Sequence, residues 1–330
     1  MPVLLLFFLS PALWAIQLFE VKTAHPTFNF LLVAKDHESA AEALNQFKNS
    51  VNQQPELSTV YSTAELNEFQ IIAARPLGLA NPDKPQVIVL ANRGYDISAA
   101  GKTKPQRRIN LFYQKLQQKN HLLILPVGMT HRFSNSERQE LFQKMNSSFQ
   151  GLLTLGGPDV DPELYSETNE HSIDINSYRD QLEFEVVKSW LKFKKGFTFG
   201  VCRGHQMIAA ALGFKLVQHI ENHGHEKFKT HAIEVLSTTS HFLKDIAPSG
   251  RLFVNSYHHQ AVLAQYHPDI EIAAQALDGT VEALESKDGR IFTTQFHYEF
   301  MTTKSAKNIF EKISDKLRRQ KTHQCLNLFN

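Results

Sequence analysis

The sequence has few cysteines and no marked excess of charge of either sign. Two cysteines in 330 residues, Cys202 and Cys325, cannot form a framework of disulfide bonds. The 35 Lys and Arg residues against 33 Asp and Glu residues leave a formal net charge of +2, with a pI of about 8.4. A nucleic-acid-binding domain usually has a higher pI and basic residues clustered on one face. These absences exclude a disulfide-stapled scaffold and argue against a nucleic-acid partner.

The sequence also lacks an apolar run long enough to span a membrane, which needs about 20 residues. Val3 to Leu9 are all apolar, and the apolar character resumes after two residues and continues through Ile16. This length matches the apolar core of a signal peptide with Ala15 at the cleavage position, although no Lys or Arg precedes Lys22. Residues 1–15 are therefore predicted to be a signal peptide of an exported protein with no stable membrane insertion. A buried terminal segment or a mis-assigned start codon is the alternative, and the protein would then be cytoplasmic.

The rest of the chain has the composition of a soluble globular protein, with 42% hydrophobic and 21% charged residues. Its length allows one large domain or two ordinary ones, at about 150 residues per domain. Residues 16–85 form an N-terminal extension without a recognisable chemical motif, and they are expected to act as a lid, a pro-segment or a partner site. Apolar periodicity predicts helices over Ser39–Phe47 and Ala64–Ala74. The prolines and glycine of residues 76–85 predict a linker.

Residues 86–330 alternate between short apolar runs and helical patterns. The predicted strands are Val87–Ala91, Leu122–Val127, Leu152–Leu155 and Phe197–Val201, and the predicted helices between them are Ile109–Gln118, Glu137–Met145 and Arg179–Trp190. Such alternation predicts a parallel sheet with helices on both faces. More closely spaced strands, namely Ala232–Leu236, Ile270–Ala274 and Ile291–Phe296, predict a smaller antiparallel portion. A helix with one apolar stripe is predicted over Ser305–Arg319.

One motif places a cysteine between a strand and a helix. The strand ending in Gly200-Val201 leads into Cys202-Arg203-Gly204, and a helix-forming run follows as far as Gly213. A nucleophile bracketed by glycines in a strand-to-helix turn is the elbow of the α/β hydrolases. The helix N-terminus beneath the sulfur favours thiolate over thiol. An isolated cysteine is more often a buried apolar residue, but this context favours a nucleophile.

A thiol nucleophile needs a base, and the base needs a group that orients it. His297 and Glu299 are two residues apart at the end of a predicted strand, so they project to the same side of the chain. A carboxylate there can hold the imidazole in one tautomer. Gly156 and Gly157 end another predicted strand, where uncovered backbone N–H groups can receive an oxyanion. A packing histidine and an ordinary Gly-Pro turn are the alternatives for these two patterns.

Five motifs follow one another along the chain. They are Gly156-Gly157-x-Asp159-Val160-x-Pro162-x-x-Tyr165, Arg179-Asp180-x-x-Glu183, Gly200-Val201-Cys202-Arg203-Gly204-x-Gln206, Asn255-Ser256-x-His258-His259-Gln260 and Gln295-Phe296-His297-x-Glu299. Together they resemble the class I glutamine amidotransferase superfamily, and within it the γ-glutamyl hydrolase-like branch, peptidase family C26. The γ-glutamyl-γ-aminobutyrate hydrolases have the most similar pattern. The resemblance extends from about Gln86 to Met301.

The resemblance implies an α/β fold, with a flavodoxin-like sheet, helices on both faces and a smaller antiparallel portion. It implies a catalytic triad of Cys202, His297 and Glu299. The oxyanion donors that it implies are the backbone N–H groups of Gly157 and Arg203, and Arg179 and Asp180 would support the site. The substrate-binding residues that it implies are Gly156, Gln206, Tyr257, His258, His259 and Gln260. The implied reaction is hydrolysis of a small γ-glutamyl amide through a γ-glutamyl thioester, which releases glutamate without a cofactor or a metal.

One residue departs from the family pattern, and other functions remain open. Tyr298 stands between the histidine and the acid, where the family usually has a proline that fixes the backbone angle φ. A glutaminase that supplies ammonia to a separate synthase is one alternative function, and a non-catalytic binding protein on the same scaffold is another. His223, His225 and His231 have a spacing that can ligate zinc. A solvated histidine-rich loop is favoured over a metal site there.

Overall fold

The computed structural model describes residues 16–23, 28–77, 84–91, 111–193, 195–220, 230–236 and 240–326. The predicted signal peptide lies outside these residues, as do most of the predicted linker and the histidines at positions 223 and 225. The described strands are β1 (Ile16–Thr23), β2 (Asn29–Lys35), β3 (Ile71–Pro76), β4 (Gln86–Leu90), β5 (His121–Ile124), β6 (Gly151–Thr154), β7 (Phe197–Val201), β8 (Leu216–Val217), β9 (Thr230–Val235), β10 (Arg251–Asn255), β11 (Ala261–Val262), β12 (Ile270–Ala276), β13 (Val281–Ser286) and β14 (Ile291–Thr294). The described helices are α1 (Ala40–Gln53), α2 (Pro55–Ser58), α3 (Thr63–Glu68), η1 (Val127–Arg132), α5 (Asn135–Ser148), η2 (Pro162–Tyr165), α6 (Ser177–Phe193), α7 (Arg203–Ala211), η3 (Tyr298–Phe300) and α8 (Lys304–Leu326). A further helical segment covers residues 111–116.

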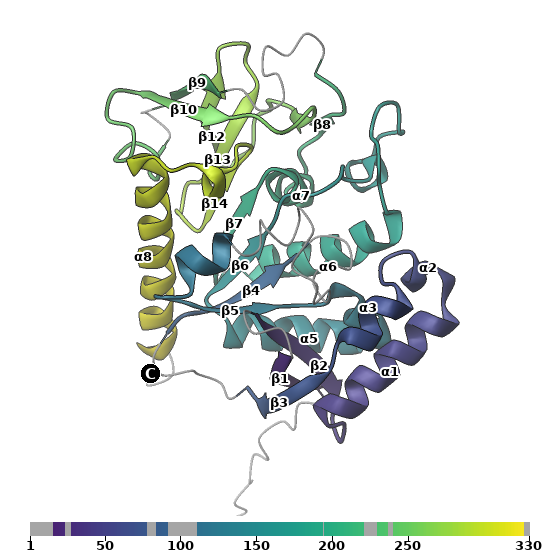
Figure 1. Cartoon of the computed structure of the whole chain (residues 1–330). Helices are drawn as coiled ribbons and strands as arrows, with labels where there is room; N and C mark the ends of the chain where they lie inside the picture. The colour runs from purple at the N-terminus through teal and green to yellow at the C-terminus, as the bar shows by residue number, and fades with distance from the viewer. Residues whose placement is uncertain are drawn as a thin grey trace, which may run out of the picture.

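The described strands form one mixed sheet (Figure 1). Its main order is β10-β9-β12-β13-β14-β7-β6-β4-β5-β2-β1-β3, with β8 and β11 attached beside β13. The strands from β14 to β2 in this order run parallel to their neighbours. The four strands on the β14 side, at the top of Figure 1, are paired antiparallel. This arrangement confirms the flavodoxin-like α/β fold and its smaller antiparallel portion.

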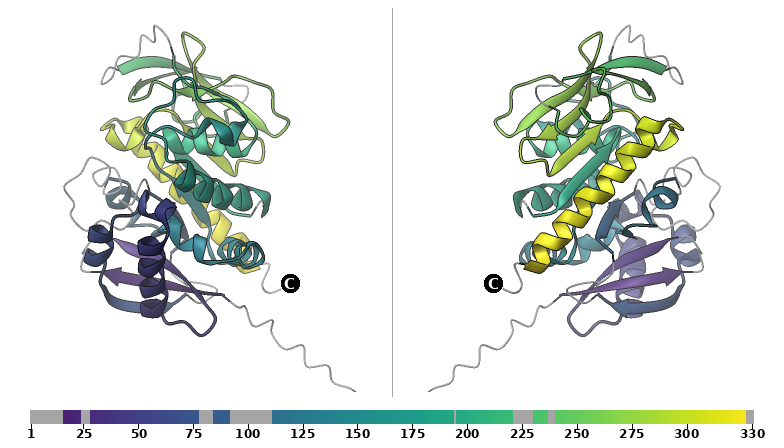
Figure 2. Two further views of the ribbon diagram at one scale, coloured as in Figure 1. Left: turned by 90° about the vertical axis from the view of Figure 1, so that its right-hand side faces the viewer. Right: turned by 90° about the vertical axis from the view of Figure 1, so that its left-hand side faces the viewer.

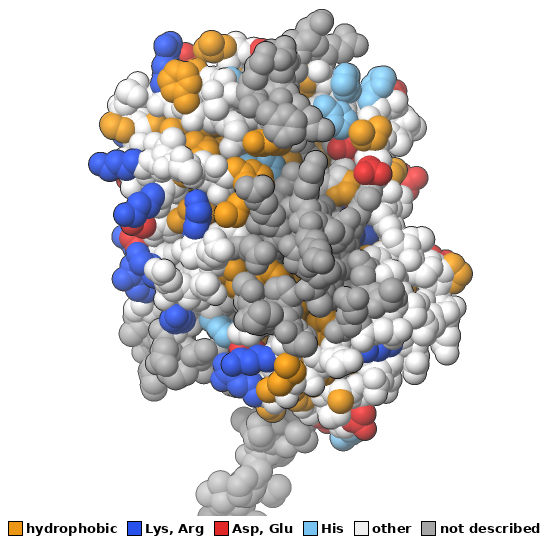
Figure 3. Space-filling model, in the orientation of Figure 1, with side chains coloured by type: hydrophobic (Ala, Val, Ile, Leu, Met, Phe, Trp, Pro, Cys, Tyr) orange, Lys and Arg blue, Asp and Glu red, His pale blue; other side chains and the backbone are white. Residues whose placement is uncertain are grey.

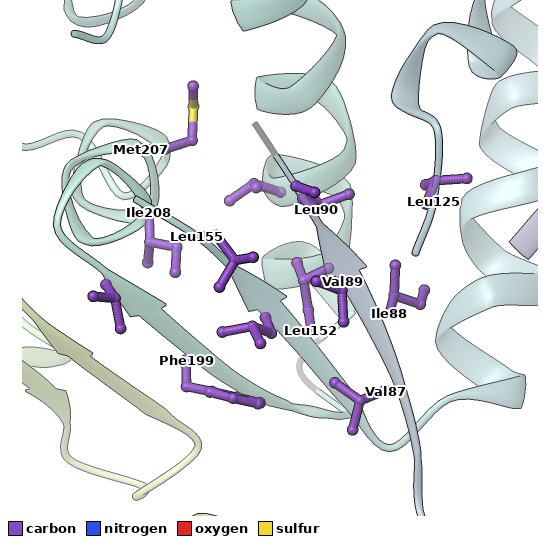
Figure 4. Close-up of a cluster of buried hydrophobic side chains, with 14 of the residues drawn as sticks. Val87, Ile88, Val89, Leu90, Leu125, Leu152, Leu155, Phe199, Met207 and Ile208 are labelled. Carbon is purple, nitrogen blue, oxygen red and sulfur yellow. The ribbon is translucent and has the colours of Figure 1, made fainter. Parts of the chain in front are cut away.

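The core explains why the central strands have continuous apolar sequences. The side chains of Val87, Ile88, Val89 and Leu90 are at most 1% exposed, because both faces of β4 are covered. Figure 4 shows these residues among Leu152, Phe199 and Ile208, which come from neighbouring strands and from α7. Figure 2 shows α8 on one face of the sheet and α6 and α7 on the opposite face. The predicted apolar stripe of α8 is buried as expected, at Ala306, Ile309, Phe310, Ile313 and Leu317.

The N-terminal extension adds three strands to the same sheet. Strand β2 pairs in parallel with β5, with Asn29 opposite Leu123, and β1 joins β2 to the edge strand β3. The helix predicted over Ala64–Ala74 is wrong in its second half, because α3 ends at Glu68 and Ile71–Pro76 forms β3. Backbone pairing with β1 stabilises this segment as a strand, and a local apolar pattern does not reveal such a distant partner.

The extension also contacts the loops at the carboxyl ends of the parallel strands. The Tyr61 hydroxyl accepts a hydrogen bond from the backbone N–H of Gly128 in η1, at 3.0 Å. The side chain of Asn176 donates to the carbonyl of Thr59 at 3.0 Å. Asn176 lies directly before α6. The extension therefore supports the loop from which α6 begins, and α6 carries charged residues of the site described below.

The surface shows how the nearly balanced charge is distributed. Lys and Arg side chains gather along the α8 side of the molecule in Figure 3, and α8 contributes Lys304, Lys307, Lys312, Lys316, Arg318, Arg319 and Lys321. Two acidic residues of the described surface pair with this group: Asp245 lies 2.8 Å from Lys312, and Asp315 contacts Arg318. Among the described residues, none of the helices combines the length and apolar character that crossing a membrane requires.

Candidate active site

Cys202 follows β7 at the carboxyl edge of the sheet. There β7 lies between β6 and β14, with Thr154 opposite Gly200 and Thr294 opposite Val201. The backbone of Cys202 has φ of 54° and ψ of −112°, a conformation that non-glycine residues rarely adopt. Its N–H donates to the carbonyl of Thr294 at 2.8 Å. The residue therefore turns the chain sharply from β7 into α7, as the elbow motif predicts, and such strain is concentrated at functional sites.

The two glycines of the motif are required by close backbone contacts. A Cβ atom on Gly204 would lie 2.2 Å from the carbonyl oxygen of Thr154. A Cβ atom on Gly200 would lie 2.7 Å from the carbonyl oxygen of Gly204. The hydroxyl of Thr154 also donates to that carbonyl at 3.1 Å. The first turn of α7 thus packs directly on the end of β6, which leaves no space for side chains at either position.

His297 and Glu299 lie just beyond the end of the neighbouring strand β14. The Nδ1 atom of His297 is 2.6 Å from Oε1 of Glu299, and both side chains are buried. The side chain of Asn255 holds the backbone of His297 twice, accepting from its N–H at 2.9 Å and donating to its carbonyl at 2.8 Å. The imidazole is therefore fixed both through its main chain and through one ring nitrogen.

The imidazole also interacts with Cys202. Burial by itself lowers the pKa of His297, but the charges of Glu299 and Cys202 and hydrogen bonds to both side chains raise the pKa to about 9. The imidazole consequently holds its proton at neutral pH. Such a pair can keep the sulfur as a thiolate and can then deliver the proton to a departing amine.

A buried ion cluster lies behind the elbow. Arg203 is 1% exposed, and its guanidinium donates to Asp180 at 2.6 Å and to Glu183 at 2.7 Å. Arg179 pairs with Glu183 at 3.0 Å and donates to the carbonyl of Ala91 at 3.0 Å. Burial lowers the pKa of Arg203, but its two carboxylate partners outweigh that effect and raise the pKa above the ordinary arginine value. The cluster links the first turn of α7 to α6. Arg179 and Asp180, which were predicted to support the site, belong to this link.

The predicted oxyanion donors lie at the ends of these elements. Arg203 is the first residue of α7, and the first N–H groups of a helix have no partner within the helix. Gly156 and Gly157 follow β6, and β6 is the neighbour of β7, the strand that leads into the elbow. Gly156 is buried and Gly157 is partly exposed. Both backbone segments therefore reach the carboxyl edge of the sheet where Cys202 lies.

The predicted substrate-binding side chains differ in their surroundings. The Tyr257 ring lies edge-on to the His297 ring, with centroids 5.5 Å apart, and it is partly exposed. Gln206 donates to the carbonyl of Gln260 at 3.2 Å and to the side chain of Gln295 at 3.1 Å. The Gln260 side chain in turn donates to Ser172 at 2.8 Å. Of these residues, Tyr257 is therefore the one placed against the candidate base, while the glutamines join the loops around it.

The two adjacent histidines point to different acidic groups. Nε2 of His259 lies 3.0 Å from Asp159, and the His259 side chain is 34% exposed. His258 bonds through Nδ1 to the carbonyl of Gln260 at 3.0 Å, and its Nε2 lies 3.7 Å from the buried Glu282. His231, one of the three histidines considered for zinc, lies 3.2 Å from the same carboxylate. Within the described ranges, no three or more His, Cys, Asp and Glu side chains are grouped so that they can hold a metal ion.

Sequence reasoning assigned no role to two residues that the structure places at the site. Asn255 holds the backbone N–H and carbonyl of His297. The sequence shows Asn255 as part of a family motif but does not indicate this contact. His205, in the first turn of α7, is fully buried and bonds through Nδ1 to Thr293 at 2.7 Å. Burial lowers the pKa of His205 to about 3, so this imidazole is neutral. The position of Asn255 in the motif, ending a strand before two histidines, was the available indication of its role.

Comparison with known proteins places this chain in a family. Residues 109–299 match the family model of Peptidase C26. NtpR of Enterococcus hirae is 37% identical over 162 residues, which are 45% of this chain and 66% of NtpR. The glutamine amidotransferase-like protein YvdE of Lactococcus lactis is 30% identical over 215 residues, which are 61% of this chain and 84% of YvdE.

A solved structure supports the fold. The glutaminase domain of Trypanosoma brucei CTPS, determined with bound acivicin, superposes with a TM-score of 0.52 at 13% identity, over 71% of this chain and 94% of that one. The family match covers more than half of this chain and includes the elbow, His297 and Glu299. The chain therefore belongs to the Peptidase C26 family of the class I glutamine amidotransferase superfamily.

Proposed function

We propose that this protein hydrolyses a γ-glutamyl amide bond through a thioester on Cys202. Family membership is consistent with cysteine-dependent hydrolysis of an amide, and the γ-glutamyl substrate is our proposal. One observation carries it. A cysteine in a strained strand-to-helix turn lies beside a buried histidine whose Nδ1 is 2.6 Å from Glu299. This arrangement contains the nucleophile, the proton carrier and the orienting carboxylate that amide hydrolysis needs.

In the proposed reaction, the Cys202 thiolate attacks the γ-carbonyl carbon, and the backbone N–H groups of Gly157 and Arg203 receive the negative charge on oxygen. The C–N bond then breaks as His297 transfers its proton to the departing amine, which leaves a γ-glutamyl thioester. Water next attacks the thioester while His297 accepts a proton from it. Cleavage of the C–S bond releases glutamate and restores the thiolate–imidazolium pair.

The aromatic residues around His297 supply one wall of the proposed substrate site. Tyr257 and Phe300 lie 5.5 and 5.4 Å from the imidazole, measured between ring centroids, and 5.7 Å from each other. Such rings exclude water from one side of the imidazole, which strengthens its interaction with charged partners. We propose that the substrate binds against the exposed part of Tyr257.

The function is tested by incubating purified protein with a panel of γ-glutamyl amines, γ-glutamyl peptides and free glutamine, and measuring released glutamate. We expect glutamate from at least one γ-glutamyl compound, and none from any compound with Cys202→Ala. Release from glutamine alone would instead favour a glutaminase that supplies ammonia to a separate synthase. No release from any compound would favour a non-catalytic binding protein on this scaffold.

A matched control separates loss of the thiol from loss of the fold. Cys202→Ser replaces the thiol by a hydroxyl of similar size at the same position, so its thermal unfolding should be close to that of the native protein. Its turnover should still be lost, because His297 cannot keep a hydroxyl ionised as it can a thiol.

A further inference from the structure

Tyr298 belongs to a cluster of three buried aromatic rings behind the proposed triad. Its ring is edge-on to Phe310 of α8, with centroids 5.0 Å apart, and to Phe112 of the helical segment 111–116, at 5.6 Å. Phe112 and Phe310 are themselves edge-on at 5.7 Å. Mutual edge-to-face contacts of this kind fix the orientation of each ring. The cluster therefore joins η3 to two helices on the same face of the sheet.

This cluster anchors the short segment that carries the proposed acid. Tyr298 is the first residue of η3, directly between His297 and Glu299, and it is 1% exposed. On its other side, the backbone of His297 is held by Asn255. The chain is thus fixed immediately before and immediately after the imidazole. A shift of the tyrosine ring is therefore expected to move the backbone on both sides of Tyr298. Such a movement would change how the side chains of His297 and Glu299 are oriented relative to each other.

The hydroxyl of Tyr298 makes no hydrogen bond to any group that the structure describes, although it is buried. An unsatisfied buried hydroxyl usually costs about 1–3 kcal/mol. Burial and the nearby charge of Glu299 raise the pKa of Tyr298 well above the ordinary tyrosine value, so the side chain is neutral. The residue contributes through its ring, and its hydroxyl neither donates to Glu299 nor carries charge.

We propose that Tyr298 is a positioning residue, whose ring packs against both Phe112 and Phe310 and thereby holds Glu299 in hydrogen-bonding contact with His297. In this way packing restrains the backbone at a position where the family resemblance led us to expect the covalent ring of proline. The inference deepens the proposed function and rests on it, because it assigns Tyr298 a role in the same triad.

The charged groups that act on the His297–Glu299 pair come from two elements. Cys202 stands at the start of α7, and its charge and hydrogen bond act on His297. Lys115, in segment 111–116, interacts with the charge of Glu299, and its amine donates to the carbonyl of Met301 at 3.4 Å. None of these groups is itself substituted when the tyrosine ring is changed. A change in the acid–base behaviour of His297 would therefore report on the alignment of Glu299.

The test compares Tyr298→Leu with Tyr298→Phe and follows the rate at which iodoacetamide alkylates Cys202 across pH. With leucine we expect the alkaline change in the alkylation profile to move about one pH unit lower, because an imidazolium that is no longer held by its carboxylate loses its proton at lower pH. With phenylalanine we expect the native profile, because the three-ring cluster is kept. In turnover assays, the leucine variant should lower kcat and leave KM within about twofold.

Two further variants keep the test decisive. Phe149→Leu removes an equally buried ring at the end of α5 and should lower stability without changing the alkylation profile. If Tyr298→Leu does not fold, Phe112→Leu loosens the same cluster while leaving the sequence of η3 intact. A native profile in both cluster variants would overturn the proposal, as would a Tyr298→Phe variant that behaves like the leucine variant. If native protein hydrolyses no γ-glutamyl compound, the proposed function fails, but the alkylation profiles still decide the role of Tyr298.

Discussion

Replacing Glu299 by glutamine changes the charge next to His297 and almost nothing else. Glutamine has nearly the same size and can still occupy the position 2.6 Å from Nδ1. It carries no negative charge, so the imidazolium loses its main source of stabilisation. We expect Cys202→Ala to abolish turnover, His297→Asn nearly to abolish it, and Glu299→Gln to fall between them.

The size of the Glu299 effect follows from the acid–base behaviour of His297. Its pKa is raised from an ordinary 6.5 to about 9, in spite of burial, by Glu299 first and Cys202 second. At about 1.4 kcal/mol for each tenfold change in acidity, this corresponds to about 3 kcal/mol in favour of the imidazolium. Losing the part due to Glu299 should lower turnover about 10- to 10²-fold, and a wrong tautomer should extend the loss to about 10³-fold. Serine-protease triads lose about 10⁴ on the equivalent change, but a thiol depends less on its base.

The assay is the pH dependence of kcat for the native and Glu299→Gln proteins. The pKa of His297 is raised from 6.5 to about 9, so the imidazolium and its stabilising effect are fully present below pH 6.5. The proton, and the stabilisation with it, is lost as pH rises through about 9. The native protein should therefore lose activity above about pH 9, and the variant should lose it at lower pH. Unchanged turnover and an unchanged alkaline limb in Glu299→Gln, with His297→Asn inactive, would refute this reasoning and indicate a Cys–His dyad.

Three further predictions concern the elbow. Gly204→Ala should destabilise the fold by about 1–3 kcal/mol and abolish turnover, because its Cβ would overlap a backbone carbonyl of β6. The control is Gly250→Ala, at a position where φ is 75° and the space around the new Cβ is open. This variant should lower stability and leave turnover unchanged. Chemical denaturation and glutamate release measure both. Arg203→Met should lower the free energy of unfolding by about 3–5 kcal/mol, because it leaves buried carboxylates without their main partner; an unchanged denaturation midpoint would contradict this. Iodoacetamide should label Cys202 much faster than Cys325 in native protein at neutral pH, and mass spectrometry of the two peptides would expose equal labelling.

The candidate site was largely predictable because its residues lie in local motifs at strand ends. Cys202 follows a largely apolar strand and His297 follows the predicted strand Ile291–Phe296, and the carboxyl ends of neighbouring parallel strands meet at one edge. The two glycines that flank the cysteine indicate a sharp turn, whatever the position of the strand in the sheet. The contact between these two segments therefore follows from the fold class and needs no knowledge of distant packing.

The remaining features depend on partners that are far away in the sequence. Strand β3 is held by β1, with Phe19 opposite Pro76, and no local pattern identifies that pairing. The partners of Arg203 lie on α6, so the sequence indicated a supporting role for this helix without the contacts. Tyr298 looked like a departure from the family pattern, because the rings that hold it come from two other helices.

The central claim, a γ-glutamyl thioester on Cys202, can be measured directly. Protein is mixed with a γ-glutamyl compound that it turns over, quenched in acid within a single turnover, digested and analysed by mass spectrometry. The account predicts one γ-glutamyl group on the peptide that contains Cys202 and none on the same peptide from Cys202→Ala. Substrate consumption without any adduct on Cys202, together with native turnover by Cys202→Ala, would contradict it.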